Sequence, residues 1–490
     1  MIILSEVKPI HKQLKMTKPE ISFLPVKAYI PAGMPDIDAL VEGTGLKPDR
    51  VRAIYHQFYM KRLADASNDN VVKTDKYKGG WVSLSSILLT KVATNKYNNY
   101  MRFLLKKRLI EVRVTITGSK SYAVNSSSVQ YKIPISLLRT AYGIRHFRKE
   151  KITSHSTLKA IHELKQSFRL KPDNKHLPLL PIHGTMREML KMVRFDIDKA
   201  EDFLNKVAKK LITVRPTRSG IERSYSELLM LMESINEGNY ERYLVDKFGE
   251  RFHTQISNLW KELRPFMYFT DEPNRPLVAL DLANSQVYFS SIAIHSALVD
   301  DVLPEFSPCI PYLDRIKNNA DYKLFAELCA TGCLYEYWMQ LRGFDRDTAK
   351  NEIFRIMFCR NLRIEKRPHI LAFKSEFPSV YSCFRTIKNL TNRHLPFIES
   401  LFLKDTGVYE GQKASHKILS AMMQRMESRI IIHRIAPKLI EHGITPFVTI
   451  HDSFIVKQGY ELQTKQLMED EFRVLGVIPP KIKVEFLKPR

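Results

Sequence analysis

The stretch FVTIHDSFIV, residues 447–456, places His451 and Asp452 between two apolar runs that are rich in β-branched residues. Runs of this kind are typical of strands inside a sheet. A buried carboxylate without a partner is strongly destabilising, because it loses its hydration and gains nothing in return. Asp452 therefore requires a partner, such as a cation, a metal ion or a ring of hydrogen-bond donors.

The composition is that of a globular protein with a strong positive charge. The 490 residues include 77 Lys and Arg against 52 Asp and Glu, for a formal net charge of +25. This excess favours polyanionic partners, nucleic acid before a membrane surface, with solubilising charge alone as the alternative. Because no apolar run approaches the roughly 18 residues of a membrane span, we expect no membrane partner. The five cysteines, an odd number, indicate reduced thiols in a cytosol-like compartment.

Residues 1–138 show the element order of a winged-helix module. Ser83 is a candidate cap for a short helix, and Asn95 precedes a second helix with one apolar face, formed by Tyr97, Met101, Leu104 and Leu105. The hydrophobic period then changes to two, with Gly118 and Ser119 as a turn. Four basic residues of the second helix are expected to lie along DNA phosphates: Lys96, Arg102, Lys106 and Lys107. A winged helix that binds a protein, or nothing, is the alternative.

Composition divides the remainder of the chain into three parts. Residues 139–183 are basic and end in spaced prolines, which predicts a linker. Residues 184–270 carry amphipathic helix signals. Residues 271–490 combine helix and strand signals and contain Asp452.

A second acidic residue stands in the same setting as Asp452. In RPLVALDLANSQ, Asp281 ends the apolar run 277–280 and is followed by small polar residues. Two carboxylates at the ends of buried strands are what two-metal phosphoryl transfer requires. Mg²⁺ is commonly held by one or two carboxylates, with waters and substrate phosphates as further ligands. The two aspartates are therefore a candidate metal site.

A helix between the two acids adds cations and aromatic rings. In FDRDTAKNEIFRIMFCRN, four side chains fall at i, i+4 steps on one helical line: Arg346, Lys350, Phe354 and Phe358. Such a line offers two cations for a triphosphate and two rings for a base and a sugar. The alternative is an amphipathic helix whose basic residues only face solvent.

These segments resemble the motifs of family A (DNA polymerase I-like) polymerases and of the related single-subunit RNA polymerases of phages and mitochondria. LDLANSQ is similar to motif A, RDTAKNEIFRIMFC to motif B and IHDSF to motif C, while FGERFHTQISNLWKELRPF resembles the arginine-containing segment before motif A. The resemblance covers residues 249–490, with the motifs in the family's order. It implies an α+β right-hand polymerase: a palm with an antiparallel sheet and helical fingers over 271–490, and a thumb-like helical region with a template-primer contact segment over 184–270.

The resemblance also implies roles for individual residues. Asp281 and Asp452 would bind two Mg²⁺ ions, or Mn²⁺ in their place, together with the backbone carbonyl of Leu282. Lys350 would act as a catalytic cation on the triphosphate, assisted by Arg346, while Phe354 and Phe358 would pack on the nucleotide. Residues implied to contact template-primer are Arg251, Arg264, His451, Gln424 and Glu427, with a solvated or core-capping role as the alternative for the last two.

Three departures from the family pattern bear on the product. Gln286 stands where DNA polymerases usually carry a glutamate and RNA polymerases a glycine; a glutamine is large enough to block the ribose 2′-hydroxyl but can also hydrogen-bond it. Phe358 replaces a tyrosine whose hydroxyl helps RNA polymerases to recognise ribose, and its absence favours deoxynucleotides. Ser453, in contrast, matches the RNA polymerase form of motif C. The balance favours DNA synthesis.

The resulting hypothesis is a template-dependent DNA polymerase of a phage or other mobile element, acting as a monomer in the cytoplasm of a bacterial or phage-infected cell. Its expected partners are DNA template-primer and dNTPs, with RNA left open and with accessory replication proteins. No proofreading is expected, because the acidic cluster FDIDKAEDF has a helical period. One alternative is an RNA polymerase or primase-like enzyme of the same fold. The other is a non-catalytic DNA-binding replication protein.

Overall fold

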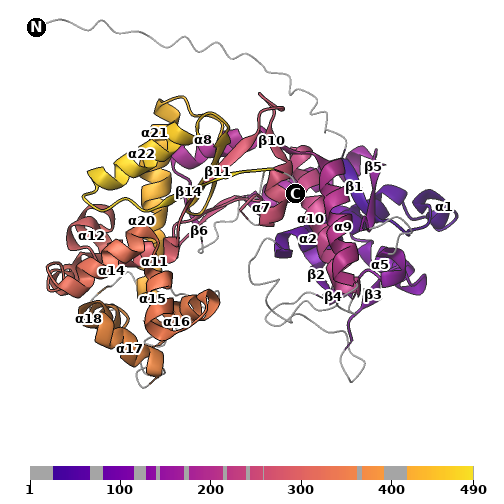
Figure 1. Cartoon of the computed structure of the whole chain (residues 1–490). Helices are drawn as coiled ribbons and strands as arrows, with labels where there is room; N and C mark the ends of the chain where they lie inside the picture. The colour runs from indigo at the N-terminus through magenta and orange to yellow at the C-terminus, as the bar shows by residue number, and fades with distance from the viewer. Residues whose placement is uncertain are drawn as a thin grey trace, which may run out of the picture. The chain divides into compact units, whose positions relative to one another are not determined.

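The computed structural model describes residues 26–66, 81–114, 129–138, 144–169, 176–212, 218–238, 243–257, 259–360, 367–390, 395 and 417–488. The chain divides into two compact units, the first formed by residues 1–64 and 75–171 and the second by residues 65–74 and 172–490. Both combine helices with small antiparallel sheets, as Figure 1 shows. Among the described residues, no helix is both long enough and apolar enough to cross a membrane.

The first unit contains two small sheets and a set of surrounding helices. Its elements are β1 (Val26–Pro31), α1 (Ile37–Val41), α2 (Pro48–Ala66), β2 (Val82–Leu84), α4 (Ser86–Ala93), α5 (Tyr97–Lys106), β3 (Glu111–Val112), β4 (Val129–Lys132), α6 (Ile135–Leu138), β5 (Phe147–Ile152) and α7 (His155–Arg169). Strands β2, β4 and β3 form an antiparallel sheet in that order, and β1 pairs with β5. Buried aromatic side chains such as Tyr29, Tyr55 and Phe147 form its core.

The expected order of two helices followed by strands occurs as α4, α5, β3 and β4. The expected cap is corrected: Ser83 lies within β2, and the hydroxyl of Ser85 accepts the N–H of Leu88 at 3.2 Å. The sequence could not separate the two serines, because both precede the same apolar run. The expected turn at Gly118 and Ser119 lies outside the described residues.

The predicted linker 139–183 needs a larger correction. Its described part contains β5 and α7, which belong to the first unit. Strand β5 pairs with β1 over its whole length, and the carboxylate of Asp49 on α2 accepts the backbone N–H groups of Thr153 and Ser154 at 2.9 and 2.6 Å. These partners are about 100 residues away along the chain, so the basic composition alone suggested an unpaired segment.

The second unit is built around a four-stranded antiparallel sheet in the order β12-β13-β11-β14. The strands are β11 (Leu277–Leu282), β12 (Val448–Ile450), β13 (Ser453–Lys457) and β14 (Ile482–Phe486). Every residue of β13 is buried, which explains why Phe454, Ile455 and Val456 are consecutive apolar residues without alternation. The one lysine in this strand, Lys457, pairs with Asp271 and Glu272 at 2.7 and 2.6 Å.

Helices and short strands precede and surround this sheet. The segment before it comprises β6 (His176–Leu177), α8 (Pro181–Leu190), β7 (Val193–Phe195), α9 (Ile197–Ile212), α10 (Arg218–Asn236), β8 (Leu244–Asp246), β9 (Phe252–His253), the 3-10 helix η2 (Lys261–Phe266) and β10 (Met267–Phe269). After β11 come α11 (Ser285–Ile292), α12 (Ser296–Val302), the 3-10 helix η3 (Pro304–Cys309), α13 (Ile310–Leu313), α14 (Ala320–Thr331), α15 (Leu334–Arg342), α16 (Arg346–Phe358), α17 (Pro368–Glu376) and α18 (Pro378–Ile387).

The final helices are α20 (Ile418–Ser428), the π-helix η6 (Arg429–Ile435), α21 (Ala436–Glu441) and α22 (Glu461–Val474). Helices α11 and α20 pack on each other, and α22 packs on β11. Figure 1 shows α14 to α18, in salmon and orange, gathered at one end of this unit, with α11 and α20 between them and β11. Helices α11 and α20 thus lie between α16, which carries Arg346 and Lys350, and β11, which carries Asp281.

Candidate active site

Asp281 and Asp452 lie next to each other in the central sheet. Asp281 stands opposite Ser453 in the antiparallel pairing of β11 with β13. Asp452 immediately precedes Ser453, in the tight turn that it forms with His451 between β12 and β13. The hydroxyl of Ser285, at the start of α11, donates a hydrogen bond to the Asp452 carboxylate. The strand register therefore brings together two acids that are far apart in the sequence.

The surroundings of both carboxylates disfavour their charged forms. Solvent reaches the Asp281 side chain, but the surrounding protein and the charge of Asp452 raise the pKa of Asp281 to about 6. Burial raises the pKa of Asp452, and the Ser285 hydroxyl acts in the opposite direction. Arg264 favours the charged form of both acids but does not offset their repulsion. A cation bound between the carboxylates would remove this penalty.

The donor set fits Mg²⁺ better than Zn²⁺. Two carboxylates, with the backbone carbonyl of the neighbouring Leu282 as the resemblance implies, would offer hard oxygen ligands, which Mg²⁺ and Mn²⁺ prefer. Within the described ranges, no group of three or more His, Cys, Asp or Glu side chains is arranged to hold a metal ion. Zn²⁺ needs three or four protein ligands, whereas Mg²⁺ keeps several waters and takes further ligands from substrate phosphates.

Basic residues close to the acids are held by other carboxylates. Arg251 forms two hydrogen bonds with Glu427 on α20, from Nε to Oε1 at 2.8 Å and from Nη2 to Oε2 at 3.0 Å. Glu427 is only 1% exposed, and its burial raises the pKa of the carboxyl although Arg251 opposes that effect. Among the lysines, Lys261 lowers the pKa of Asp281 the most, and its ammonium group pairs with the Glu485 carboxylate at 2.7 Å. Glu427 therefore holds the Arg251 side chain in place. It does not face solvent, where a bound DNA duplex would lie.

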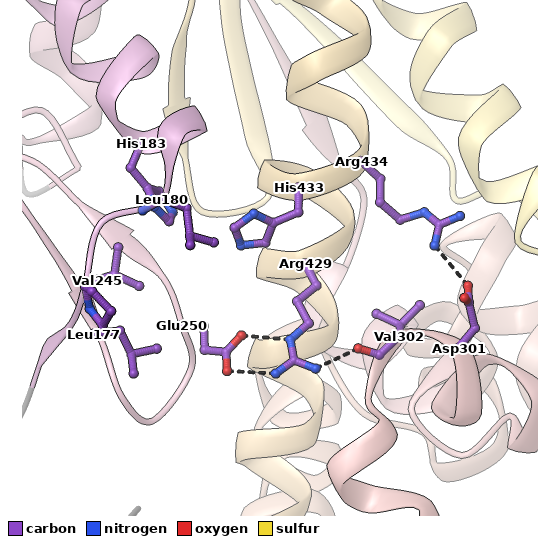
Figure 2. Close-up of a pocket in the computed structure, with 11 residues that line it drawn as sticks. Leu177, Leu180, His183, Val245, Glu250, Asp301, Val302, Arg429, His433 and Arg434 are labelled. Atoms are coloured by element: carbon purple, nitrogen blue, oxygen red, sulfur yellow. Dashed lines mark hydrogen bonds and ion pairs between the residues drawn. The ribbon is translucent and has the colours of Figure 1, made fainter. Parts of the chain in front are cut away.

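A second ion pair fixes the hairpin that carries Arg251. Figure 2 shows Glu250, which directly precedes Arg251, facing Arg429 on the π-helix η6. The guanidinium of Arg429 donates to both Glu250 oxygens at 2.8 Å and to the backbone carbonyl of Val302, also at 2.8 Å. Burial alone would lower the pKa of Arg429, but its hydrogen bonds with Glu250 and Glu305 raise it overall. The β8–β9 hairpin is thereby attached to the helix that also carries Glu427.

The cavity in Figure 2 lies beside this attachment and has a volume of about 450 Å³. His183 on α8 and His433 on η6 face each other there, with ring centroids 5.4 Å apart. The Nδ1 atom of His183 accepts the N–H of Leu180 at 3.0 Å, so Nε2 carries the proton of the neutral ring. Burial, followed by the proximity of His433, lowers the pKa of His183 to about 4. Because one ring nitrogen accepts a backbone N–H and the pKa of the ring is low, we infer that His183 is neutral and has a structural role.

Helix α16 presents the predicted line of cations and rings on its outer face. Its buried face includes Ala349, Ile353 and Ile356, among others. Along the line that adjoins this buried face, Arg346 and Lys350 are exposed, and Phe354 and Phe358 are half-buried. The ammonium of Lys350 lies 5.4 Å from the Phe354 ring centroid, and the Phe354 and Phe358 rings are 5.6 Å apart. The carboxylate of Asp345 caps the helix by accepting the N–H of Thr348 at 2.9 Å.

Asn284 connects this helix to the turn after Asp281. Its backbone is left-handed, with φ of 55°, which asparagine tolerates better than most residues. Its side-chain amide donates to the carbonyl of Gly332 at 2.8 Å, and its oxygen accepts from Arg346 at 3.3 Å. Arg346 also pairs with Glu336 on α15. Asn284 thus sets the position of a cation of α16 relative to the acids.

Two histidines meet at the turn that carries Asp452. His451 has a left-handed backbone, with φ of 55°, and its ring lies 5.8 Å from that of His253. His253 is oriented by the carboxylate of Asp246, 2.9 Å from its Nε2 atom. The Ser453 hydroxyl donates to the carbonyl of Ile450 at 2.9 Å, so this residue serves the hairpin itself.

The remaining predicted residues are Gln286, Gln424 and the basic residues at α5. Gln286 is half-buried in the first turn of α11. Gln424 is half-buried on α20, and its amide donates to the hydroxyl of Ser420 at 3.3 Å. A Cβ atom on Gly249 would lie 2.6 Å from the Gln424 side chain, so only glycine fits there. Four exposed basic residues on α5 or at its caps belong to the first unit, whereas both acids belong to the second: Lys96, Arg102, Lys106 and Lys107.

Four residues at or near this site were not predicted from the sequence: Asp246, His253, Asn284 and Ser285. Asn284 had a usable signal, because an asparagine directly between a strand and a helix is a frequent left-handed position. The other three depend on pairings that their own segments do not show: Asp246 meets His253 through the β8–β9 hairpin, and Ser285 meets Asp452 from a distant part of the chain. No local pattern indicates such contacts.

Comparisons with known proteins give limited information. No protein-family model matches the sequence, and no curated protein matches it. Among solved structures, the fold is similar to the POL domain of Pol1 from M. smegmatis, described in complex with DNA primer-template and dNTP, with 12% sequence identity and a TM-score of 0.30. The matched region covers 57% of this chain and 54% of that one, about half of its length. A likeness this weak carries no functional argument.

Proposed function

We propose that this chain is a template-dependent DNA polymerase that adds dNTPs to a primer 3′ end by two-metal phosphoryl transfer. One observation above all supports the proposal: Asp281 on β11 stands opposite Ser453, Asp452 lies in the turn directly before that residue, and the pKa values of both acids are raised. The contact of Asn284 with Arg346 adds a helix of cations and rings to that site. Acids, cations and rings are what a metal-bound nucleotide needs at its phosphates, base and sugar.

In this proposal the two aspartates, with the carbonyl of Leu282, hold two Mg²⁺ ions, or Mn²⁺ in their place. The ions would supply activation of the primer hydroxyl and stabilisation of the pyrophosphate leaving group. Ser285 keeps the Asp452 carboxylate oriented through its hydrogen bond. Arg264 offsets part of the negative charge of both acids before the ions bind.

The outer face of α16 would bind the incoming nucleotide. Lys350 and Arg346 would neutralise the triphosphate, and Lys350 would donate a proton to the departing pyrophosphate. Arg346 would exchange Glu336 for a phosphate, because both are anionic partners for the same guanidinium. Phe354 and Phe358 would pack on the sugar and the base.

Two side chains support a deoxynucleotide as the substrate. Gln286, in the first turn of α11, has the size to exclude a ribose 2′-hydroxyl. Phe358 provides a ring without a hydroxyl that could recognise ribose. On the DNA side, Arg251, Arg264 and His451 would contact the template-primer, and Gln424 and Glu427 would hold the hairpin around Arg251.

The parts of the fold would then correspond to a right hand. The sheet with α11, α20 and α22 would be the palm, α14 to α18 the fingers, and the helices between residues 184 and 270 a thumb-like region. In the first unit, the order β2, α4, α5, β3, β4 and the sheet order β2-β4-β3 support a winged helix. Its exposed basic residues on α5 would bind DNA phosphates.

Primer extension with purified protein tests the proposal. We expect the parent protein to extend a primed DNA template with Mg²⁺ and dNTPs, and Asp452→Asn to reduce kcat by about a thousandfold or more. Asp300→Asn is the matched control, because Asp300 is an exposed aspartate on α12. Extension by Asp452→Asn at the parental rate would exclude the assigned metal site.

The same assay separates the rival functions. Preference for ribonucleotides, or chain initiation without a primer, would identify an RNA polymerase or primase-like enzyme. An RNA template in parallel reactions would show which template is used. Binding of primer-template by a parent protein that never extends it would indicate a non-catalytic DNA-binding replication protein.

A further inference from the structure

A buried lysine holds the end of helix α16. Lys388, at the C-terminal end of α18, is only 2% exposed. Its ammonium group donates to the backbone carbonyls of Ile356 at 2.8 Å and Cys359 at 3.1 Å. Both carbonyls lie at the C-terminal end of α16, and they bracket Phe358 in the sequence. One side chain from another helix therefore holds the turn that carries Phe358.

The chemistry of a helix end explains this placement. The last carbonyls of an α-helix have no intrahelical donor, and a cation there is favoured by the helix dipole. Burial of an ammonium group is costly, and it lowers the pKa of Lys388 to about 8, with Cys359 acting in the opposite direction. An exposed lysine or an ordinary glycine cap would satisfy the same carbonyls without that cost. Unlike a simple cap, the buried lysine also links α16 to α18.

Helix α18 is a rigid support for this link. Its side chains Phe384 and Ile387 are fully buried or nearly so. The Phe384 ring lies 6.0 Å from that of Phe325 on α14, in an edge-to-face arrangement. Helix α18 also packs against α20, the helix that carries Glu427. Lys388 thereby connects the last turn of α16 to α18, which packs on α14 and α20.

We propose that Lys388 is a positioning residue for nucleotide binding, which sets the last turn of α16 so that Phe358 packs against the incoming nucleotide. This inference rests on the proposed function, because it assigns the outer face of α16 to that nucleotide. Lys388 does not itself touch substrate. Its loss weakens the binding of dNTP and leaves the binding of primer-template and the chemistry of the acids unchanged.

The test uses Lys388→Met, which keeps the length and apolar character of the stem but cannot donate a hydrogen bond. We expect the KM for dNTP to rise about tenfold, with kcat and the KM for primer-template changed by less than about twofold. Hydrogen exchange of the full chain should accelerate at the backbone amides of residues 355–360 and remain unchanged in α14. Lys374→Met is the matched control, because Lys374 is an exposed lysine on the neighbouring α17.

Direct binding of a fluorescent dNTP with Mg²⁺ makes the outcome independent of turnover. Weaker dNTP binding by Lys388→Met in a protein that extends no primer would support the role of Lys388 while the polymerase proposal fails. Faster exchange in α16 with unchanged dNTP binding would overturn the inference and leave Lys388 as a structural cap. Equal loss of dNTP and primer-template affinity would also overturn it, because that pattern indicates general unfolding of the unit. A parent protein that binds no dNTP at all would exclude both proposals.

Discussion

In the proposed metal site, a proton and a metal ion would compete for the Asp281 carboxylate. The pKa of this group is raised from 3.8 to about 6 by its protein surroundings and by Asp452. A carboxyl with a raised pKa in the folded state stabilises the fold fully below its unfolded pKa, and that stability is lost as the pH rises through about 6. Bound Mg²⁺ selects the ionised carboxylate and should restore the lost stability above that pH.

We therefore expect millimolar Mg²⁺ to raise Tm by about 2–4 °C at pH 8 and to have no effect at pH 4.5. Differential scanning calorimetry with and without MgCl₂ across this pH range measures the effect. Asp281→Asn, which cannot ionise, should abolish the response to Mg²⁺ and remove part of the pH dependence. An Mg²⁺ response that is as large at pH 4.5 as at pH 8 would contradict the assignment of the ion to these acids.

The buried pair of Arg251 and Glu427 predicts a second residue-scale result. Glu427 is 1% exposed, whereas the Arg251 side chain is 17% exposed and has access to solvent. Removal of Arg251 leaves a buried carboxylate without its partner, so Arg251→Gln should cost about 3 kcal/mol of stability. Glu427→Gln should cost less, because the freed guanidinium can turn towards water.

Chemical denaturation of both single variants and of the double variant Arg251→Gln/Glu427→Gln measures this difference. The double variant should be more stable than the sum of the two single effects predicts, since neither charge is then left alone. Strictly additive effects would mean that the ion pair contributes no coupling. Both single variants should also raise the KM for primer-template if the pair positions Arg251 for DNA.

At the scale of elements, the sequence located the strands of the site but not their partners. The apolar runs before Asp281 and around Asp452 indicated buried strands, and β11 and β13 are buried as those runs suggest. The helix over residues 346–358 could be predicted because its period and its Asp345 cap are local signals. The register that sets Asp281 opposite Ser453 is not local, and no pattern in either segment specifies it.

The same limit explains the elements that were missed. Strand β5 lacks a strong strand pattern because its four central residues are all charged, and only its pairing with β1 makes it a strand. Lys388 looks like any surface lysine until its ammonium group meets the carbonyl of Ile356 on α16, 32 residues away along the chain. Local periodicity specifies an element, whereas caps, links and counter-ions that come from other elements require the folded arrangement.

At the scale of the whole molecule, the proposed function would divide charge recognition and chemistry between the two units. The two acids and α16, the proposed nucleotide-binding helix, belong to the second unit, and α5 belongs to the first. The net charge of +25 is therefore only partly explained by the candidate active site. A basic unit outside the active site should increase residence on DNA without changing the catalytic step.

Charge reversal on α5 tests this division of labour. Arg102→Glu with Lys106→Glu should weaken DNA binding about tenfold or more and reduce the slope of log K against log salt by about one for each phosphate that is no longer neutralised. Single-turnover insertion on saturating primer-template should keep its rate, because no residue near Asp281 changes. Lys159→Glu is the matched control on the same unit, since Lys159 is exposed on α7. Its Nζ atom lies 3.9 Å from the Oε1 atom of Glu163. An unchanged salt slope in the α5 variant would show that the helix does not bind phosphates, and a reduced insertion rate at saturation would show that the two units do not act separately.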